Sequence, residues 1–213
     1  MVSNLANAFE YLHGTIQLLY RGLVPEAVGL DRKGVPQLCD FRFSKALLDE
    51  TKTYTICGTP EYMSPEQVTG MGHGFEADWW SLGILVYEAL VGTTPWSGDG
   101  KNEIGIYSSI SSFTNETLRL PAFVDSGAAE FVTALLKENI NDRLREAISV
   151  RNHPFIKSAT LKFQGAPSPF ESHLSEAFRL VLNGPRVEPD SLDSLEEPYS
   201  GSETFSDWTL EGH

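Results

Sequence analysis

Residues that could do chemistry gather in two short stretches, LLYRGLVPEAVGLD at positions 18–31 and CDFRFSK at positions 39–45. The first has the spacing of a catalytic loop, yet Arg21 has no acid beside it and Glu26 has no amide after it. The second contains Asp40, and a single carboxylate is a poor site for a magnesium ion. The two stretches therefore look like the frame of a catalytic site that has lost much of its chemistry.

The elements that must position these residues are mostly helical. Apolar residues recur at helical spacing over 4–13, and residues 78–90 are apolar on nearly all sides, which predicts a central buried helix. Short extended runs over 27–31 and 35–39 flank a turn and predict a β-hairpin, whereas residues 42–64 lack periodicity and predict a long loop. Further helices are expected over 102–112, 127–138 and 142–149. The predicted fold class is mainly α.

The composition limits the classes of partner. The 213 residues carry a formal net charge of −13, which argues against nucleic acid and membrane surfaces and suits basic peptides or proteins. Cys39 and Cys57 form no C-x-x-C pair, so neither a disulfide framework nor a zinc site is expected. Because the chain shows neither a secretory signal nor an apolar stretch long enough to span a membrane, we expect a soluble, cytoplasmic protein.

Four ordered motifs carry a resemblance to a known family: CDFRFSK at 39–45, ICGTPEYMSPE at 56–66, DWWSLGILVYE at 78–88 and NDRLREA at 141–147. Together they resemble the large lobe of a serine/threonine protein kinase, closest to the cyclic-nucleotide-dependent branch of the AGC family. The resemblance implies a large lobe over residues 1–170 and an acidic AGC-type tail over 171–213, largely extended or disordered. The small lobe is expected to be absent, because no glycine-rich loop and no V-A-I-K lysine precede the first helix.

The resemblance assigns structural roles to three residues. Glu66 and Arg143 are implied to form a buried ion pair that joins the activation segment to the last helices. Breaking such a pair leaves a buried charge unpaired, at a cost of roughly 3–5 kcal/mol. Asp78 is expected to cap the central helix and to accept hydrogen bonds from the backbone of the catalytic loop.

The catalytic loop departs from the family pattern Y-R-D-L-K-P-E-N at the positions of its chemistry. Gly22 stands where the acid would accept the substrate proton, Val24 where a lysine would steady the phosphoryl group, and Ala27 where an asparagine would hold magnesium. Gly29 replaces the apolar side chain expected beneath the adenine. A positioned proton acceptor alone contributes ~10²–10⁴ in rate, which corresponds to about 3–5.5 kcal/mol of barrier.

The metal-binding motif is altered less. Asp40 is present, but Arg42 replaces the glycine of the family's Asp-Phe-Gly and brings a cation close to the magnesium position. The resemblance implies ATP and Mg²⁺ as cofactors, whereas these substitutions argue against their binding by this chain. Asp40 is then a residual, weak metal ligand.

The positions that would bind a peptide are better preserved. Glu26, Glu88 and Thr59 match peptide-binding positions of basophilic kinases, although the two glutamates could equally be ordinary surface or capping residues. Thr55 matches the phosphorylation site of the activation loop and Arg21 the arginine that binds its phosphate. The default interpretation of Cys57 is a small packed residue, with redox sensing as the alternative.

The tail holds one further motif. Phe205 and Trp208 resemble the F-x-x-F motif near the end of AGC kinases, which docks on a small lobe. Here the motif could bind the small lobe of another kinase, or it could be a relic.

Three hypotheses for function remain open at this stage. The first is an inactive pseudokinase fragment that binds proteins or basic peptide segments. The second is an active cyclic-nucleotide-dependent-type kinase whose N-terminal part is truncated or misread. The third is a decayed product with no function.

Overall fold

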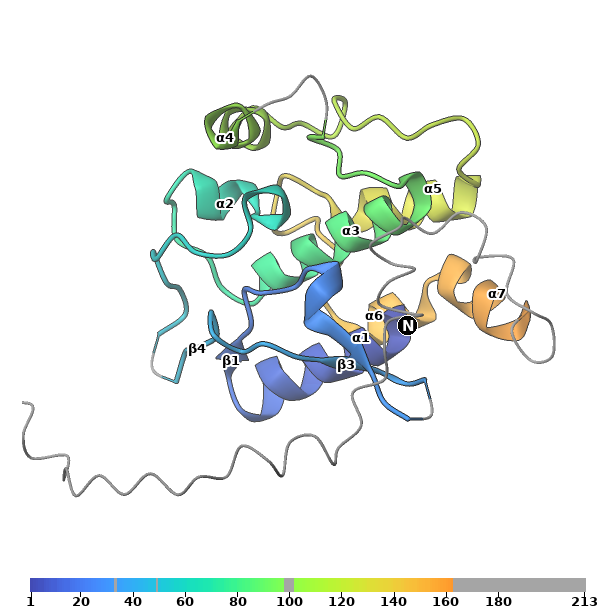
Figure 1. Ribbon diagram of the computed structural model, residues 1–213, viewed down its shortest axis with the longest axis horizontal. Helices are drawn as coiled ribbons and strands as arrows, with labels where there is room; N and C mark the ends of the chain where they lie inside the picture. The colour runs from blue at the N-terminus through green and yellow to red at the C-terminus, as the bar shows by residue number, and fades with distance from the viewer. Residues whose placement is uncertain (33, 49, 98–101, 163–213) are drawn as a thin grey trace, which may run out of the picture.

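The structure is a computed structural model that describes residues 1–32, 34–48, 50–97 and 102–162. Helix α3 (Glu76–Val91) runs through the centre and is buried along most of its length, as its apolar sequence predicts. Helix α1 (Val2–Glu10) packs against it on one side and α5 (Ser126–Leu135) on the other (Figure 1). A side chain at Gly83 would meet Leu135 and Leu136 at less than 3.0 Å, so this glycine allows α3 and α5 to approach closely.

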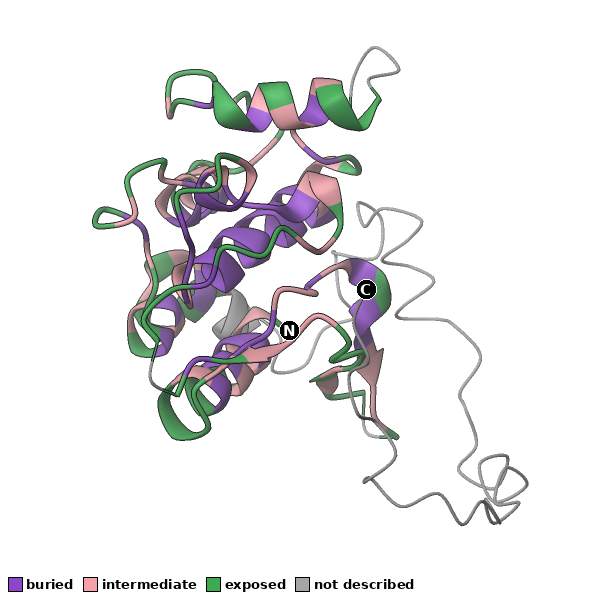
Figure 2. Ribbon diagram, turned by 90° about the vertical axis from the view of Figure 1, so that its left-hand side faces the viewer, coloured by how far each residue is buried: buried purple, intermediate pink, exposed green. Residues whose placement is uncertain are grey.

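The remaining helices surround this centre. Helix α2 (Pro65–Val68) contacts α4 (Glu103–Ser111), and α6 (Ala147–Asn152) packs on α1. Helix α7 (Pro154–Lys162) contacts α5 and α6. The core is one apolar cluster whose largest fully buried side chains include Trp80, Tyr20, Phe9 and Phe131, and Figure 2 shows the buried residues concentrated on the central helices.

Two small antiparallel sheets position the loops. Strand β2 (Val28–Leu30) pairs with β3 (Pro36–Leu38), which is the predicted hairpin. Strand β1 (Leu18–Leu19) pairs with β4 (Lys45–Ala46). The prediction of an unbroken loop over 42–64 is therefore wrong in part, because it contains β4 and a 3₁₀ turn at Pro60–Tyr62. The described part of the chain is mainly helical with two small antiparallel sheets, as the predicted fold class requires.

Some predicted helix boundaries are also wrong. The helix expected over 142–149 begins only at Ala147, because Leu144 N donates to the carbonyl of Ala134 and Arg143 is held by distant partners. Helix α5 ends at Leu135 rather than near 138. The sequence pattern did not predict α2, a single turn with a capping box between Ser64 and Gln67. It did not predict α7 or the π-helical turn Tyr11–Thr15 that extends α1.

Two predictions concern the C-terminal end. The proposed tail over 171–213, including Phe205 and Trp208, lies outside the described residues. Within the described ranges, no helix has both the length and the apolar character needed to cross a bilayer.

Candidate functional site

The candidate site is built on the loop from Tyr20 to Ala27, which Asp78 of α3 fixes in place. The Asp78 side chain is fully buried, and its Oδ2 and Oδ1 accept hydrogen bonds from the backbone N atoms of Tyr20 and Arg21, both at 2.8 Å. Nε2 of His13 lies 2.8 Å from Oδ2. The expected hydrogen bonds from the loop backbone to Asp78 are thus confirmed. The expected cap of α3 is wrong, because the helix begins at Glu76 and the carboxylate turns toward the loop.

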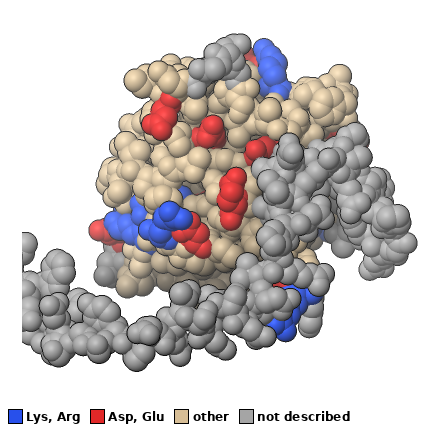
Figure 3. Space-filling view, viewed as in Figure 1, with Lys and Arg blue, Asp and Glu red and all other residues tan. Residues whose placement is uncertain are grey.

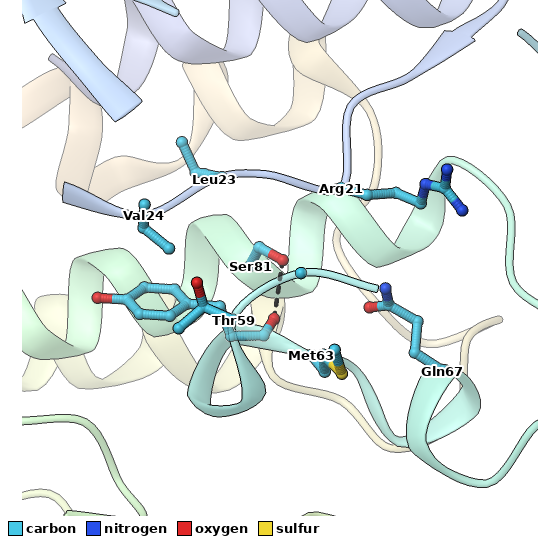
Figure 4. A pocket seen from close by; sticks show the side chains of 9 residues that line it. Arg21, Leu23, Val24, Thr59, Met63, Gln67 and Ser81 are labelled. Atoms are coloured by element: carbon cyan, nitrogen blue, oxygen red, sulfur yellow. Dashed lines mark hydrogen bonds between the residues drawn. The ribbon is translucent and has the colours of Figure 1, made fainter. Parts of the chain in front are cut away.

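The loop borders a small hollow whose lining includes few reactive side chains. Nine residues line it: Arg21, Leu23, Val24, Gly58, Thr59, Tyr62, Met63, Gln67 and Ser81. Among these nine, Arg21 is the one residue with a charged side chain, and it extends away from Val24, which points toward Thr59 (Figure 4). No carboxylate or lysine lines the hollow, and its one cation, Arg21, extends away from Val24, so the hollow offers no basic proton acceptor and no cation at Val24 for a phosphoryl group.

The position of Gly22 has room for a side chain. An added Cβ would meet only the carbonyl of Asp40 at 3.5 Å and the rings of Phe43 and Tyr20 at 3.7 Å, which are ordinary contacts. At Gly29 the reverse holds, because an added Cβ would lie 2.9 Å from Sγ of Cys39. The side chain of Cys39 thus occupies the space that an apolar side chain at position 29 would need in order to lie beneath an adenine.

Asp40 is engaged by a neighbouring cation. Nε of Arg42 donates to Oδ1 of Asp40 at 2.7 Å, and Nη2 lies 2.5 Å from Oδ2. The side-chain hydrogen bond from Arg42 holds the pKa of Asp40 below its usual value, and the same bond raises the pKa of Arg42. Both groups are therefore charged at neutral pH.

The residues around Asp40 do not fit a magnesium ion. Magnesium requires near-octahedral oxygen ligands at about 2.0–2.1 Å, whereas the oxygens of Asp40 are taken by Arg42 and Ala27 supplies no side-chain oxygen. In the described ranges, no three His, Cys, Asp or Glu side chains come together as a metal site.

Arg21 lies close to the predicted phosphorylation site. Its Nε donates to the carbonyl of Phe43 at 2.7 Å, and its Nη1 lies 3.5 Å from the carbonyl oxygen of Thr55, whose side chain is exposed. Lys45 is bonded nearby to Oγ1 of Thr53 at 3.2 Å. Cys57 is half-buried, and burial raises the pKa of its thiol, which favours the packed-residue interpretation over redox sensing.

Acidic side chains gather beside the loop. Glu26 is exposed, and the half-buried Glu88 accepts a hydrogen bond from the hydroxyl of Tyr62. Burial raises the pKa of Glu88, and the negative charges of Glu26 and Glu61 raise it further. The structure thus groups Glu61 with the two predicted glutamates, and we call these three residues the acidic patch. Sequence reasoning missed Glu61, although it stands two residues after the predicted peptide-binding residue Thr59.

The implied ion pair between Glu66 and Arg143 is present in the structure. Nη1 and Nη2 of Arg143 donate to the two carboxylate oxygens of Glu66 at 2.6 and 3.0 Å, and both side chains are almost completely buried. Nε of Arg143 donates to the carbonyl of Lys137, and the guanidinium lies over the ring of Trp80. The pair ties α2 to the segment before α6.

Charge is unevenly distributed over the visible face of the molecule. In Figure 3, one group of Lys and Arg side chains lies at the lower left with acidic groups beside it, and further basic side chains lie at the upper and lower edges. Separate acidic side chains are scattered over the rest of the described surface in that view.

Comparisons with known proteins match most of this chain to one family. Residues 1–156 match the family model of the protein kinase domain. The chain is 36% identical to ribosomal protein S6 kinase 2 beta of Xenopus laevis over 162 residues, which is 74% of this chain and 25% of that protein. It is 36% identical to human cGMP-dependent protein kinase 2 over 180 residues, 81% of this chain and 23% of that protein.

A third relative is somewhat more similar in sequence. The chain is 41% identical to the mouse cAMP-dependent protein kinase catalytic subunit PRKX over 145 residues, 68% of this chain and 38% of that protein. The chain spans about a quarter of the length of the first curated relatives that it matches.

Proposed function

The chain belongs to the protein kinase family, among the AGC serine/threonine kinases, and we propose that it is a catalytically inactive member that binds proteins or basic peptide segments. The observation that carries this proposal is the contrast within one loop. Asp78 fixes the backbone of the loop with two hydrogen bonds, yet Gly22, Val24 and Ala27 bring no functional group to it.

Phosphoryl transfer depends on positioning and on neutralising charge. The hollow beside Gly22 contains no carboxylate to orient a substrate hydroxyl, and its Val24 and Thr59 are uncharged. Kinases use ATP and Mg²⁺ in general, and in this chain the cation of Arg42 already neutralises the one family metal ligand, Asp40. Binding of ATP with Mg²⁺ is therefore proposed to be lost together with the transfer step.

A binding role is supported by the acidic patch. Glu26 and Glu61 are accessible at least in part, and Glu88 is oriented by the hydroxyl of Tyr62. A guanidinium of a bound peptide would form charge-assisted hydrogen bonds with these carboxylates. The net charge of −13 would favour the approach of such a peptide.

The binding proposal is tested by fluorescence anisotropy with a labelled arginine-rich peptide and the full 213-residue chain. Replacing Glu26 or Glu88 by glutamine is expected to weaken binding about tenfold or more, because a hydrogen bond to a charged group contributes about 1.5–3 kcal/mol. Glu138→Gln is the matched control, since Glu138 is exposed and is not part of the acidic patch. Equal affinity for all variants would reject this surface as the peptide site.

Inactivity is tested separately by a thermal shift. We expect the melting temperature to stay unchanged when ATP and Mg²⁺ are added, because a ligand stabilises a protein only if it binds the folded state. A clear rise would contradict the proposed loss of nucleotide binding.

Thr55 is proposed as a phosphorylation site that another kinase would modify. The exposed Thr55 and the nearby Nη1 of Arg21 support this proposal, because a phosphate there could pair with the guanidinium. A phosphate on Thr55 is then expected to protect the activation segment from hydrogen exchange, and Arg21→Ala to remove that protection.

A further inference from the structure

The side chain of Arg42 holds Asp40 with a two-pronged contact. Nε and Nη2 of Arg42 reach Oδ1 and Oδ2 of Asp40 at 2.7 and 2.5 Å, so each carboxylate oxygen has its own donor. The backbone N of Arg42 adds a third, longer contact to Oδ1 at 3.3 Å. Such a bidentate contact fixes the orientation of the carboxylate and neutralises its charge.

The backbone around this pair is fixed as well. Asp40 has a φ of +59°, and the ring of Phe41 packs edge-on against Tyr20 at a centroid distance of 5.2 Å. The hydroxyl of Tyr20 donates to the carbonyl of Cys39. These contacts hold the backbone from Cys39 to Phe41. The side chains of Arg42 and Asp40 are 70% and 36% exposed, so the guanidinium is kept near the carboxylate mainly by its short tether of two residues.

A divalent cation at Asp40 would have to displace this guanidinium. It would gain few other ligands, because Ala27 ends in a methyl group and no three acidic, His or Cys side chains meet in the described residues. It would also be repelled by the displaced arginine, which is tethered two residues from Asp40. Magnesium keeps its hydration shell unless carboxylates and phosphates replace it.

We propose that Arg42 is the resident cation of this site, an internal counter-ion that takes the place of a divalent metal at Asp40. The proposal rests on the proposed inactivity and deepens it, because it gives Arg42 a part in the loss of metal beside the missing ligand at Ala27. It predicts that the site excludes divalent cations because of Arg42, and that removing this one side chain makes Asp40 available to them.

The test measures Mn²⁺ binding to the full 213-residue chain by electron paramagnetic resonance. Free Mn²⁺ gives a sharp signal, and the signal decreases as the ion binds to the protein. The expected result is tighter Mn²⁺ binding to Arg42→Gly than to the wild-type chain. The gain is expected to be at least about tenfold in affinity, which is the effect of the repulsion between charges of +1 and +2 about 5 Å apart in water. The double variant Arg42→Gly with Asp40→Asn should lose the gain.

Two control variants keep the result interpretable. Arg145→Gly removes the same charge from another exposed position and is expected to bind no more Mn²⁺ than the wild type. Arg42→Gln should gain binding as Arg42→Gly does, without the added freedom of a glycine backbone, and circular dichroism checks that each variant is folded. The proposal would be overturned if the wild type bound Mn²⁺ through Asp40, or if neither folded Arg42 variant gained binding.

This experiment is independent of the proposed loss of catalysis. Arg42→Gly leaves Gly22 and Val24 unchanged, so it is expected to gain Mn²⁺ binding without gaining phosphotransfer. Phosphotransfer by the wild-type chain would reject the proposed function, and the comparison of Mn²⁺ affinities would still decide the role of Arg42.

Discussion

Replacing Glu66 by alanine is expected to destabilise the chain strongly. The side chain of Arg143 has no measurable exposure and that of Glu66 only 5%, so the change leaves a guanidinium buried without its carboxylate. The carbonyls of Lys137 and Glu76 would remain as acceptors, but they carry no full negative charge. Removing one partner of a buried pair costs about 3–5 kcal/mol, and we expect a loss of stability in that range.

The assay is urea denaturation followed by circular dichroism, with Arg151→Ala as the matched control. Arg151 pairs with Glu10 at 2.7 Å, a similar distance, but the two side chains are 27% and 56% exposed. Exposed pairs contribute about 0.2–1 kcal/mol, so this variant should change little. Equal destabilisation by Glu66→Ala and Arg151→Ala would refute the reasoning from burial.

A double substitution separates the charge from the packing. Glu66→Leu combined with Arg143→Met replaces both charges with apolar side chains, and such replacements of buried pairs are often neutral or stabilising. We expect the double variant to be more stable than Glu66→Ala. If it were less stable, loss of packing rather than an unpaired charge would explain the effect.

Three further predictions concern single positions. Gly22→Ala should keep the stability of the wild type within about 1 kcal/mol, because an added Cβ has only ordinary contacts. Gly29→Ala should cost at most about 1 kcal/mol, because its Cβ would meet Sγ of the exposed Cys39 at 2.9 Å and that side chain can rotate away, and Cys39→Ala should relieve the cost; urea denaturation measures both. Burial lowers the pKa of His73 to about 4, so the unfolded chain binds the proton first as pH falls below about 6.5. Stability should fall by about 2 kcal/mol between pH 7 and pH 5, and His73→Phe should remove most of that loss.

The buried helix α3 and the hairpin β2–β3 could be predicted because each depends on a local pattern, an all-round apolar helix and two short runs around a turn. The start of α6 could not, since the preceding segment is set by the contacts of Arg143 and Leu144 with residues far away in sequence. The resemblance predicted that Asp78 accepts hydrogen bonds from the catalytic loop, which the structure shows, but the added expectation of a helix cap was wrong because both carboxylate oxygens are used by the loop.

The candidate site also combines features that the sequence predicts with features that only the structure reveals. The losses at Gly22, Val24 and Ala27 are visible in the sequence, because they follow from residue type alone. The two-pronged contact between Arg42 and Asp40 and the inclusion of Glu61 in the acidic patch required coordinates. Side chains of this length have many rotamers, and the sequence does not select among them.

The central claim, that this kinase lobe does not transfer phosphate, is tested most directly by a radiolabel assay. The full chain, its Asp40→Ala variant and a heat-denatured sample are incubated with γ-labelled ATP, Mg²⁺ and an arginine-rich peptide. All three are predicted to give the same background, because Gly22 and Val24 supply neither the proton acceptor nor the cation that the reaction requires. Transfer by the wild-type chain that disappears in Asp40→Ala would contradict the claim.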